Sequence, residues 1–406
     1  MGYFQDTIKG ISWVGTLRLS TRLISFFRIA ILARILTPVQ FGVFGIASFV
    51  LAFIEILTET GINVFLIQEK EKIDDYIHTA WIVSIIRGIL ISAAVILSAP
   101  FIAQFFNSAD SYLLLLLMAF VPFIRGFINP SVVKLQKEFR FQKEFWFRLL
   151  VFLIDASVAI IFVFITREPA GLVFGLIAGA LFEVVLSFLI IKPIPRLNFE
   201  KVRVKRVINR GKWVTFAGIF DYLFRNLDDM SVGKLLNTSS LGLYQMAYKL
   251  SELPITEISV VISKVTFPVF TKISGDSKRL RTAFFKTMIG ISGLIIPIGL
   301  LLILFPRQII QVALGSQWLD AAVVLQILAV FGIFRAISGS ISTLFLAVQK
   351  QELVSVVTFV NMAGLAITVI PLVLMFGMIG AGISAVIGSL LGLAVSLYFA
   401  FRILKT

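Results

Sequence analysis

The chain has 406 residues, of which 58% are hydrophobic and 15% are charged, and its formal net charge is +15. Its mean hydropathy of +0.99 excludes a soluble protein of this length, because so few charged residues cannot cover the surface. With no cysteine and a single histidine, His78, the chain cannot build disulfides, thiolate metal sites or a histidine cluster, and it contains no P-loop motif. We therefore expect no metal site and no enzymatic activity.

Twelve apolar segments recur along the whole chain, each close to the length that a helix needs to cross a bilayer. The first continues through Leu36 without a small-residue cleavage site, so we expect no cleavable signal peptide. The predicted fold class is an all-α polytopic membrane protein with twelve transmembrane helices. The segments lie at 11–36, 41–67, 79–104, 110–129, 146–166, 170–191, 213–235, 241–267, 284–305, 319–346, 353–375 and 378–400.

Lysine and arginine are concentrated in alternate connections between these segments. The basic residues cluster at 130–148, 192–212 and 272–286, whereas the other connections hold almost none. Basic connections remain on the cytoplasmic side of a membrane. The pattern predicts a protein of the cell (cytoplasmic or inner) membrane with both termini in the cytoplasm. Because the positive charge serves as an orientation signal, we do not expect a nucleic-acid partner.

The sequence also repeats itself. A shift of 200 residues aligns ARILTPVQFGVFGIA with GKLLNTSSLGLYQMA, and a second match joins the glycines of the sixth segment to those of the twelfth. We predict a six-helix half at 1–192, a basic cytoplasmic linker at 193–212 and a second six-helix half at 213–406. Six spans per half give both halves the same orientation, which is a parallel pseudo-twofold repeat about the membrane normal and typical of transporters. The second match pairs Gly171, Gly175 and Gly179 with Gly380, Ser384 and Gly388.

The first segment carries four arginines, Arg18, Arg22, Arg28 and Arg34, although one arginine at the bilayer centre costs about 2.5–3.5 kcal/mol. In a helix, the first three share a face about 120° wide, and Arg34 points away near the outer end. We expect Arg34 and Arg125, which lie near the ends of segments, to extend toward the membrane surface.

Residues at equal depth in the two arms of a predicted hairpin lie side by side, and this depth rule pairs several of the charges. In the first hairpin, Arg22 lies level with Glu55 and Arg18 with Glu59, which predicts two ion pairs. Arg28 lies level with an apolar residue, Phe49, and lacks an obvious partner. For the paired arginines, both a structural role and direct contact with a ligand fit the sequence.

The third, seventh and tenth segments contain further charges. Arg87 is a cation at a depth similar to that of Arg18, with pairing to Asp155 as the structural alternative, and Arg335 lies deep in the tenth segment. Around the hairpin of the second half, the same depth rule pairs Arg225 with Glu252 and Asp228 with Lys249. Asp229 faces Tyr248 and lacks an opposing charge.

These positions predict a hydrated interior that holds an anion, because arginine forks match phosphate and carboxylate groups. The acids of the second half are candidates for coupling transport to H+ or Na+, since an unpaired intramembrane carboxylate suits a proton or cation site. Pairing of Asp228 with Lys249 is the structural alternative, and we expect no other cofactor. The candidate ion-coupling residues are Asp229 and Asp228, and the candidate substrate-binding residues are Arg28, Arg18, Arg22, Arg87 and Arg335.

Four stretches carry a resemblance to a known family: ILARILTPVQFGVFGIA, TETGINVFLIQ, LQKEFRF and DDMSVGKLLNTSSLGLYQMAYKL. In order and spacing they resemble the polysaccharide-transporter family, the Wzx-type O-antigen and exopolysaccharide flippases of the MOP superfamily. The resemblance covers nearly the whole chain. It implies a flippase that moves polyprenyl-(pyro)phosphate-linked oligosaccharide from the cytoplasmic to the outer leaflet by alternating access, for surface polysaccharide biosynthesis.

The resemblance implies a polyprenyl-linked glycan, membrane lipids and other polysaccharide assembly proteins as partners, and we expect a monomer. Two transport alternatives within the same superfamily are a MATE-type cation-coupled multidrug antiporter and a lipid II-type flippase. The first conflicts with the arginine face, and lipid II flippases carry two further spans. A membrane scaffold, in which the charges only pair with one another, is the alternative outside transport.

Overall fold

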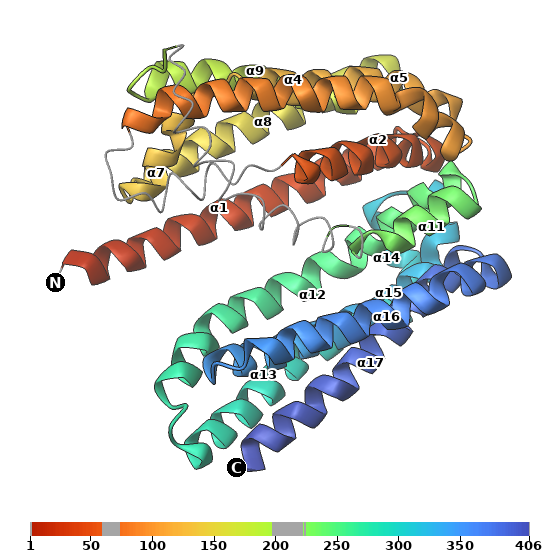
Figure 1. Ribbon diagram of the computed structural model, residues 1–406. Coiled ribbons are helices and arrows are strands. Elements are labelled where there is room, and N and C mark those ends of the chain that lie inside the picture. The colour runs from red at the N-terminus through yellow and green to blue at the C-terminus, as the bar shows by residue number, and fades with distance from the viewer. Residues whose placement is uncertain (1, 59–73, 197–221, 223–224, 406) are drawn as a thin grey trace. The chain divides into compact units, whose positions relative to one another are not determined.

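The computed structural model describes residues 2–58, 74–196, 222 and 225–405. The described residues form helices joined by short turns, and no strand occurs among them (Figure 1). Large apolar side chains remain exposed along these helices, for example Leu97 at 72% and Ile367 at 75%. Such a surface suits contact with lipid and is unusual for a protein in water. The protein is therefore an all-helical, multi-pass membrane protein.

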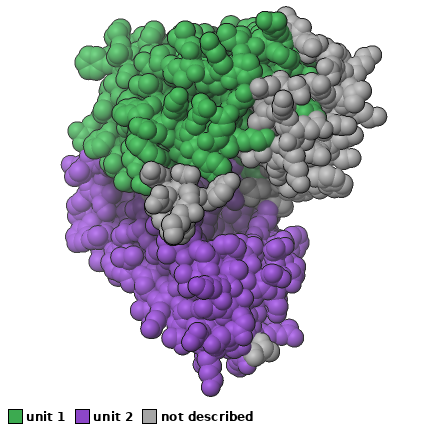
Figure 2. Space-filling model, turned by 90° about the vertical axis from the view of Figure 1, so that its left-hand side faces the viewer, with its two compact units in different colours: residues 1–223 green, residues 224–406 purple. Residues whose placement is uncertain are grey.

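The chain divides into two compact units, residues 1–223 and 224–406, which are coloured separately in Figure 2. Most of the predicted linker at 193–212 lies outside the described residues, so the predicted division into halves stays a prediction. The helices of the first unit are α1 (Gly2–Ala33), α2 (Pro38–Leu57), α4 (Asp74–Phe105), α5 (Ala109–Met118), α6 (Phe120–Arg125), η1 (Pro130–Val133), α7 (Lys134–Lys137), α8 (Phe141–Thr166) and α9 (Ala170–Ile190).

The second unit is built around α15, which packs against α12, α13 and α17. Its core includes Ile341, Leu344 and Phe345 of α15, all fully buried. Its helices are α11 (Leu227–Leu235), α12 (Thr238–Lys272), α13 (Ser277–Leu304), α14 (Pro306–Ala313), η2 (Ser316–Ala321), α15 (Ala322–Ala347), α16 (Gln351–Phe376) and α17 (Met378–Lys405).

Eight helices of the described chain are long and apolar enough to cross a membrane, or up to ten if two bent pairs each count as one span. α1 is not among them, since its arginines lower its hydropathy, although its 32 residues would extend about 48 Å. Most of the predicted seventh span lies outside the described residues. The predicted number of twelve therefore stays a prediction.

The fourth predicted span is interrupted in the structure. α5 ends at Met118 and α6 begins at Phe120, because Pro122 has no N–H to donate to the carbonyl of Met118. A bend of 73° then separates Ala109–Arg125 from Pro130–Lys137. Asn129, which precedes Pro130, has an extended backbone, as residues before proline prefer.

Two helices that lie 200 residues apart in sequence begin in the same way. Thr37 caps α2, where its side chain accepts from the backbone N–H of Gln40 and its own N–H donates to the Gln40 side chain. Asn237 caps α12, where its side chain accepts from the backbone N–H of Ser240 at 2.8 Å. Each cap fixes the start of a helix that contributes to the sites described below.

Candidate functional site

The arginine in the middle of α1 is paired. Arg28 Nη1 donates to Asp155 Oδ2 of α8 at 2.8 Å, and the two side chains are only 13% and 11% exposed. The expectation that Arg28 lacks a partner is therefore wrong, as is the alternative in which Asp155 pairs with Arg87. The hairpin rule compares only helices adjacent in sequence, whereas this contact joins residues 127 positions apart.

Two glycines of α9 make room for the carboxylate. A Cβ built on Gly175 would lie 2.9 Å from Asp155 Oδ1, and one on Gly179 would lie 2.9 Å from Asp155 Cβ. Asp155 Oδ1 is buried without a hydrogen-bond partner, so Arg28 carries most of the compensation for burying this charge. The small residues of the sixth segment thus hold an ion pair as well as allowing close helix packing.

The other predicted pairs of the first hairpin are not decided. Glu59, the expected partner of Arg18, lies outside the described residues. Arg22 and Glu55 both have contacts in the structure, and their pairing stays a prediction.

The first unit contains two neighbouring cavities of about 630 and about 420 Å³. The larger is lined mainly by α2, α4, α6 and η1, and the smaller by α1, α8 and α9. They share three side chains in their walls, Arg125, Arg148 and Glu183. Arg87 and Glu55 line the larger cavity, whereas Arg18 and Asp155 line the smaller one. Arginines from four helices thus face these two spaces, which have the size of small-ligand sites.

The Arg125 side chain lines both cavities and is 43% exposed. Its extension toward the membrane surface stays a prediction. Its Nε lies 4.0 Å from Glu183 Oε2, too far for a hydrogen bond. Arg148, which sequence reasoning missed as a site residue, donates from Nε to Glu144 Oε1 at 2.7 Å.

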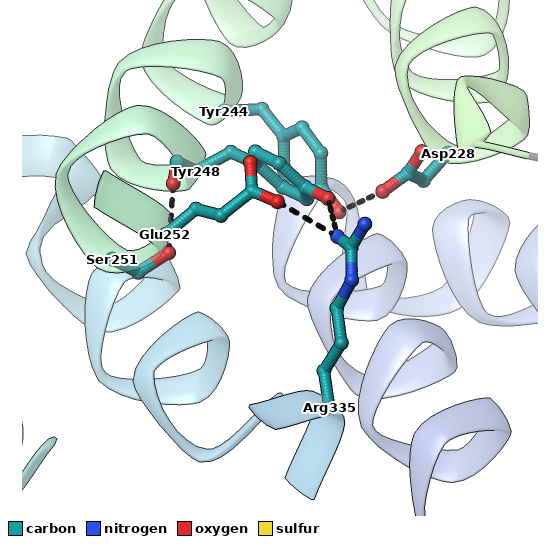
Figure 3. A network of polar contacts seen from close by, with 6 residues as sticks. All are labelled: Asp228, Tyr244, Tyr248, Ser251, Glu252 and Arg335. Carbon is teal, nitrogen blue, oxygen red and sulfur yellow. Dashed lines mark hydrogen bonds and ion pairs between the residues drawn. The ribbon is translucent and has the colours of Figure 1, made fainter. Parts of the chain in front are cut away.

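The second unit contains a network of buried and half-buried polar groups (Figure 3). Arg335 Nη1 of α15 lies 2.6 Å from the Tyr248 hydroxyl and 2.9 Å from Glu252 Oε1, both on α12. Tyr244, one turn before Tyr248, donates its hydroxyl proton to Asp228 Oδ2 of α11 at 2.7 Å. The network joins α11, α12 and α15, and it accounts for the burial of Asp228, which is 3% exposed.

The neighbouring acid, Asp229, has a different environment. Its Oδ1 is buried without a hydrogen-bond partner, and its backbone N–H donates to Asp228 Oδ1 at 3.0 Å. Lys249, on helix α12, also has contacts in the structure, so the expectation that Asp229 lacks an opposing charge stays a prediction.

Sequence reasoning missed the two tyrosines. Tyr244, Tyr248 and Glu252 recur every fourth residue and so lie on one face of α12, a signal that could have identified them. Glu252 pairs with Arg335, which the depth rule did not foresee. Arg225 and Lys249 also have contacts in the structure, so the pairs Arg225–Glu252 and Asp228–Lys249 stay predictions.

Comparison with known families identifies residues 31–323 as a match to the family described as "Polysaccharide biosynthesis protein". The chain belongs to this family. It is 28% identical to an uncharacterized membrane protein in the cps region of Klebsiella pneumoniae, over 98% of this chain and 82% of that protein. It is 25% identical to the lipopolysaccharide biosynthesis protein WzxC of Escherichia coli K12, over 87% of this chain and 72% of WzxC.

Solved structures share the fold of this family member. The lipid II flippase MurJ in an inward closed conformation matches with a TM-score of 0.72 and 20% identity, over 96% of this chain and 88% of MurJ. An inward-facing MATE-family multidrug transporter of the MOP superfamily matches with a TM-score of 0.72 and 15% identity, over 95% of each chain. The protein therefore has the MOP-superfamily fold. A flippase and a drug transporter both have it, so the fold alone does not choose a substrate.

Proposed function

We propose that the protein is a flippase that translocates polyprenyl-(pyro)phosphate-linked oligosaccharide from the cytoplasmic to the outer leaflet, for surface polysaccharide biosynthesis. The observation that carries this proposal is the pair of arginine-lined cavities in a member of a polysaccharide biosynthesis family. Three guanidinium groups around one cavity favour an anionic ligand. Of the predicted substrate-binding arginines, Arg18 and Arg87 line these cavities and belong to the same proposal, whereas Arg28 and Arg335 are paired with Asp155 and Glu252.

The predicted architecture is part of the proposed function. Twelve helices in two halves, related by a parallel pseudo-twofold axis, would let the halves move against each other in alternating access. The matching helix starts at Thr37 and Asn237 support a duplication. We place the protein in the cytoplasmic membrane as a monomer with both termini in the cytoplasm. Its partners are membrane lipids, the lipid-linked glycan and other polysaccharide assembly proteins.

The test is transport by purified protein in liposomes that contain a fluorescent polyprenyl-pyrophosphate-linked oligosaccharide. We expect the labelled sugar to appear in the opposite leaflet at a rate that depends on the protein. Liposomes with Arg140→Gln protein serve as the control and should move the sugar at the wild-type rate, because Arg140 is exposed and lines neither cavity. A rate equal to that of protein-free liposomes would contradict the proposal.

The second candidate is a multidrug antiporter that exports organic cations, and the buried Asp228 together with the buried Oδ1 of Asp229 favours it. Expulsion of a cationic dye from cells, without movement of the lipid-linked sugar, would support this alternative. Under the flippase proposal, the two acids couple transport to H+ or Na+. Asp229→Asn should then remove the dependence of transport on the ion gradient, and an unchanged dependence would exclude Asp229 as the coupling group.

A further inference from the structure

The tripeptide Ile-Arg-Gly occurs in two helices of the first unit, at residues 86–88 of α4 and at residues 124–126 at the end of α6. The two glycines meet in the structure. A Cβ on Gly88 would lie 2.6 Å from the carbonyl oxygen of Pro122, and one on Gly126 would lie 3.0 Å from that of Ser84. Only glycine allows the two backbones to approach this closely.

This crossing places the two preceding arginines in one cavity. Arg87 and Arg125 both line the cavity of about 630 Å³, and so do the crossing glycines themselves. Trp81 secures the same contact, because its Nε1 donates to the carbonyl oxygen of Phe127 at 3.0 Å. The backbone of the protein, rather than a salt bridge, therefore fixes the positions from which the two arginines extend.

The two guanidinium groups have unused donors. Arg87 Nη2 donates to the backbone carbonyl oxygen of Glu55 at 2.8 Å, and its Nε is buried without an acceptor. Arg125 meets Glu183 only at 4.0 Å. Each guanidinium carries five N–H donors, so most of the hydrogen-bonding capacity of this pair is not used by the described residues.

A third cation completes the wall. Arg148 is held by Glu144, which is buried and also accepts from Gln136 Nε2 at 2.6 Å. The acids that line this cavity are Glu55 and Glu183, and together with Glu144, which is paired with Arg148, they balance the three arginines before ligand binding. An anion with several oxygens can contact more than one guanidinium fork at once, which a single carboxylate does less well.

We propose that Arg87 and Arg125, set by the crossing of Gly88 and Gly126, bind the pyrophosphate group of the substrate in this cavity, with Arg148 as the third cation. The inference rests on the proposed function for the identity of the substrate. It moves the centre of anion binding from Arg28, which Asp155 neutralises, to Arg87. The apolar walls beside the arginines, which include Ile56, Ile91 and Val132, leave room for the first units of a prenyl chain.

Binding of geranyl pyrophosphate to purified protein in detergent, measured by calorimetry, tests this site. We expect Arg87→Gln and Arg125→Gln each to weaken binding about ten- to a hundredfold, the range for a lost charge-assisted contact. Arg87→Lys, which keeps the charge but loses the fork, should fall between wild type and Arg87→Gln. The exposed Arg140→Gln variant should bind like wild type, and melting temperatures identify any variant that is not folded.

Two competing ligands show whether the site binds a pyrophosphate group or a membrane phospholipid. Inorganic pyrophosphate should displace geranyl pyrophosphate, and phosphatidylglycerol should not. Wild-type affinity in both glutamine variants would overturn the proposal, and so would equal displacement by phosphatidylglycerol, which would indicate a site for membrane phospholipid. Because binding is measured without transport, the two proposals can fail separately. If the protein binds geranyl pyrophosphate at Arg87 but moves no lipid-linked sugar, only the proposed function is refuted. Normal transport by folded Arg87→Gln protein refutes only the site.

Discussion

At the scale of single residues, several charges within the described helices are explained by what they contact. Arg28 is neutralised by Asp155, and Arg335 by Glu252 and the Tyr248 hydroxyl. Such pairs avoid the large cost of an isolated ion in a medium of low dielectric constant. Arg87 differs, because its hydrogen bond goes to a neutral carbonyl and its charge remains available to a ligand.

Replacing Arg28 should therefore affect stability first. Arg28→Ala leaves Asp155 buried without its cation, and we expect a loss of about 3 kcal/mol, measured by thermal unfolding in detergent. Adding Asp155→Asn should restore most of the lost stability, because the uncompensated charge is removed. A variant that melts like wild type but moves no substrate would instead assign Arg28 to substrate binding.

The two tyrosines of α12 should differ in their contributions. Tyr244→Phe removes the donor to a carboxylate that is almost fully buried, so we expect a loss of about 2 kcal/mol. Tyr248→Phe removes one of two partners of Arg335, and Glu252 remains, so we expect about 1 kcal/mol. Chemical or thermal unfolding of both variants checks this order. Equal losses would mean that Tyr248 is as important to Arg335 as Glu252 is.

At the scale of helices, a polar side chain of one helix lies in a groove formed by small residues of the helix packed against it. In the first unit α9 receives Asp155 from α8, and in the second unit α17 receives Asn361 from α16 at Gly388 and Gly392. Asn361 Oδ1 is buried there without a hydrogen-bond partner. Glycine is required because a methyl group would overlap the Asn361 side chain at Gly392 and would crowd the Asn361 backbone carbonyl oxygen at Gly388.

A matched pair of glycine variants tests this packing. A Cβ on Gly392 would overlap the Asn361 side chain, whereas a Cβ on Gly290 of α13 would meet nothing within 4 Å. We expect Gly392→Ala to lower the stability by about 1–3 kcal/mol through overpacking. Gly290→Ala should leave it unchanged or raise it by up to about 1 kcal/mol, since alanine favours the helix. Similar melting temperatures for the two variants would show that α16 can shift without cost.

At the scale of the whole molecule, the distribution of positive charge predicts the orientation in the membrane. The basic connections at 130–148, 192–212 and 272–286 should face the cytoplasm together with both termini. This orientation would place the η1 and α7 wall of the larger cavity at the cytoplasmic side, where a lipid-linked precursor would enter.

Single cysteines introduced into this cysteine-free chain test the orientation. Cysteines at Arg140, Arg203 and Lys278 should resist a membrane-impermeant thiol reagent in intact cells and react after the cells are opened. A cysteine at Arg167, in a connection expected outside, should react in intact cells and serves as the control. Strong external labelling at any of the first three positions would reverse the predicted topology.

The class of the protein, the places of most spans and the family were predictable from the sequence, because apolar length, charge placement and motif order depend on local composition. The sequence also predicted that Arg87, Arg335 and Asp228 are charges within the membrane spans that need partners. Which partners they have depends on how the helices pack in three dimensions. The Arg28–Asp155 contact, the Tyr244 and Tyr248 network and the Gly88–Gly126 crossing join helices distant in sequence. Their packing depends on shape and on the rotation of each helix, which hydrophobic periodicity along one segment does not specify.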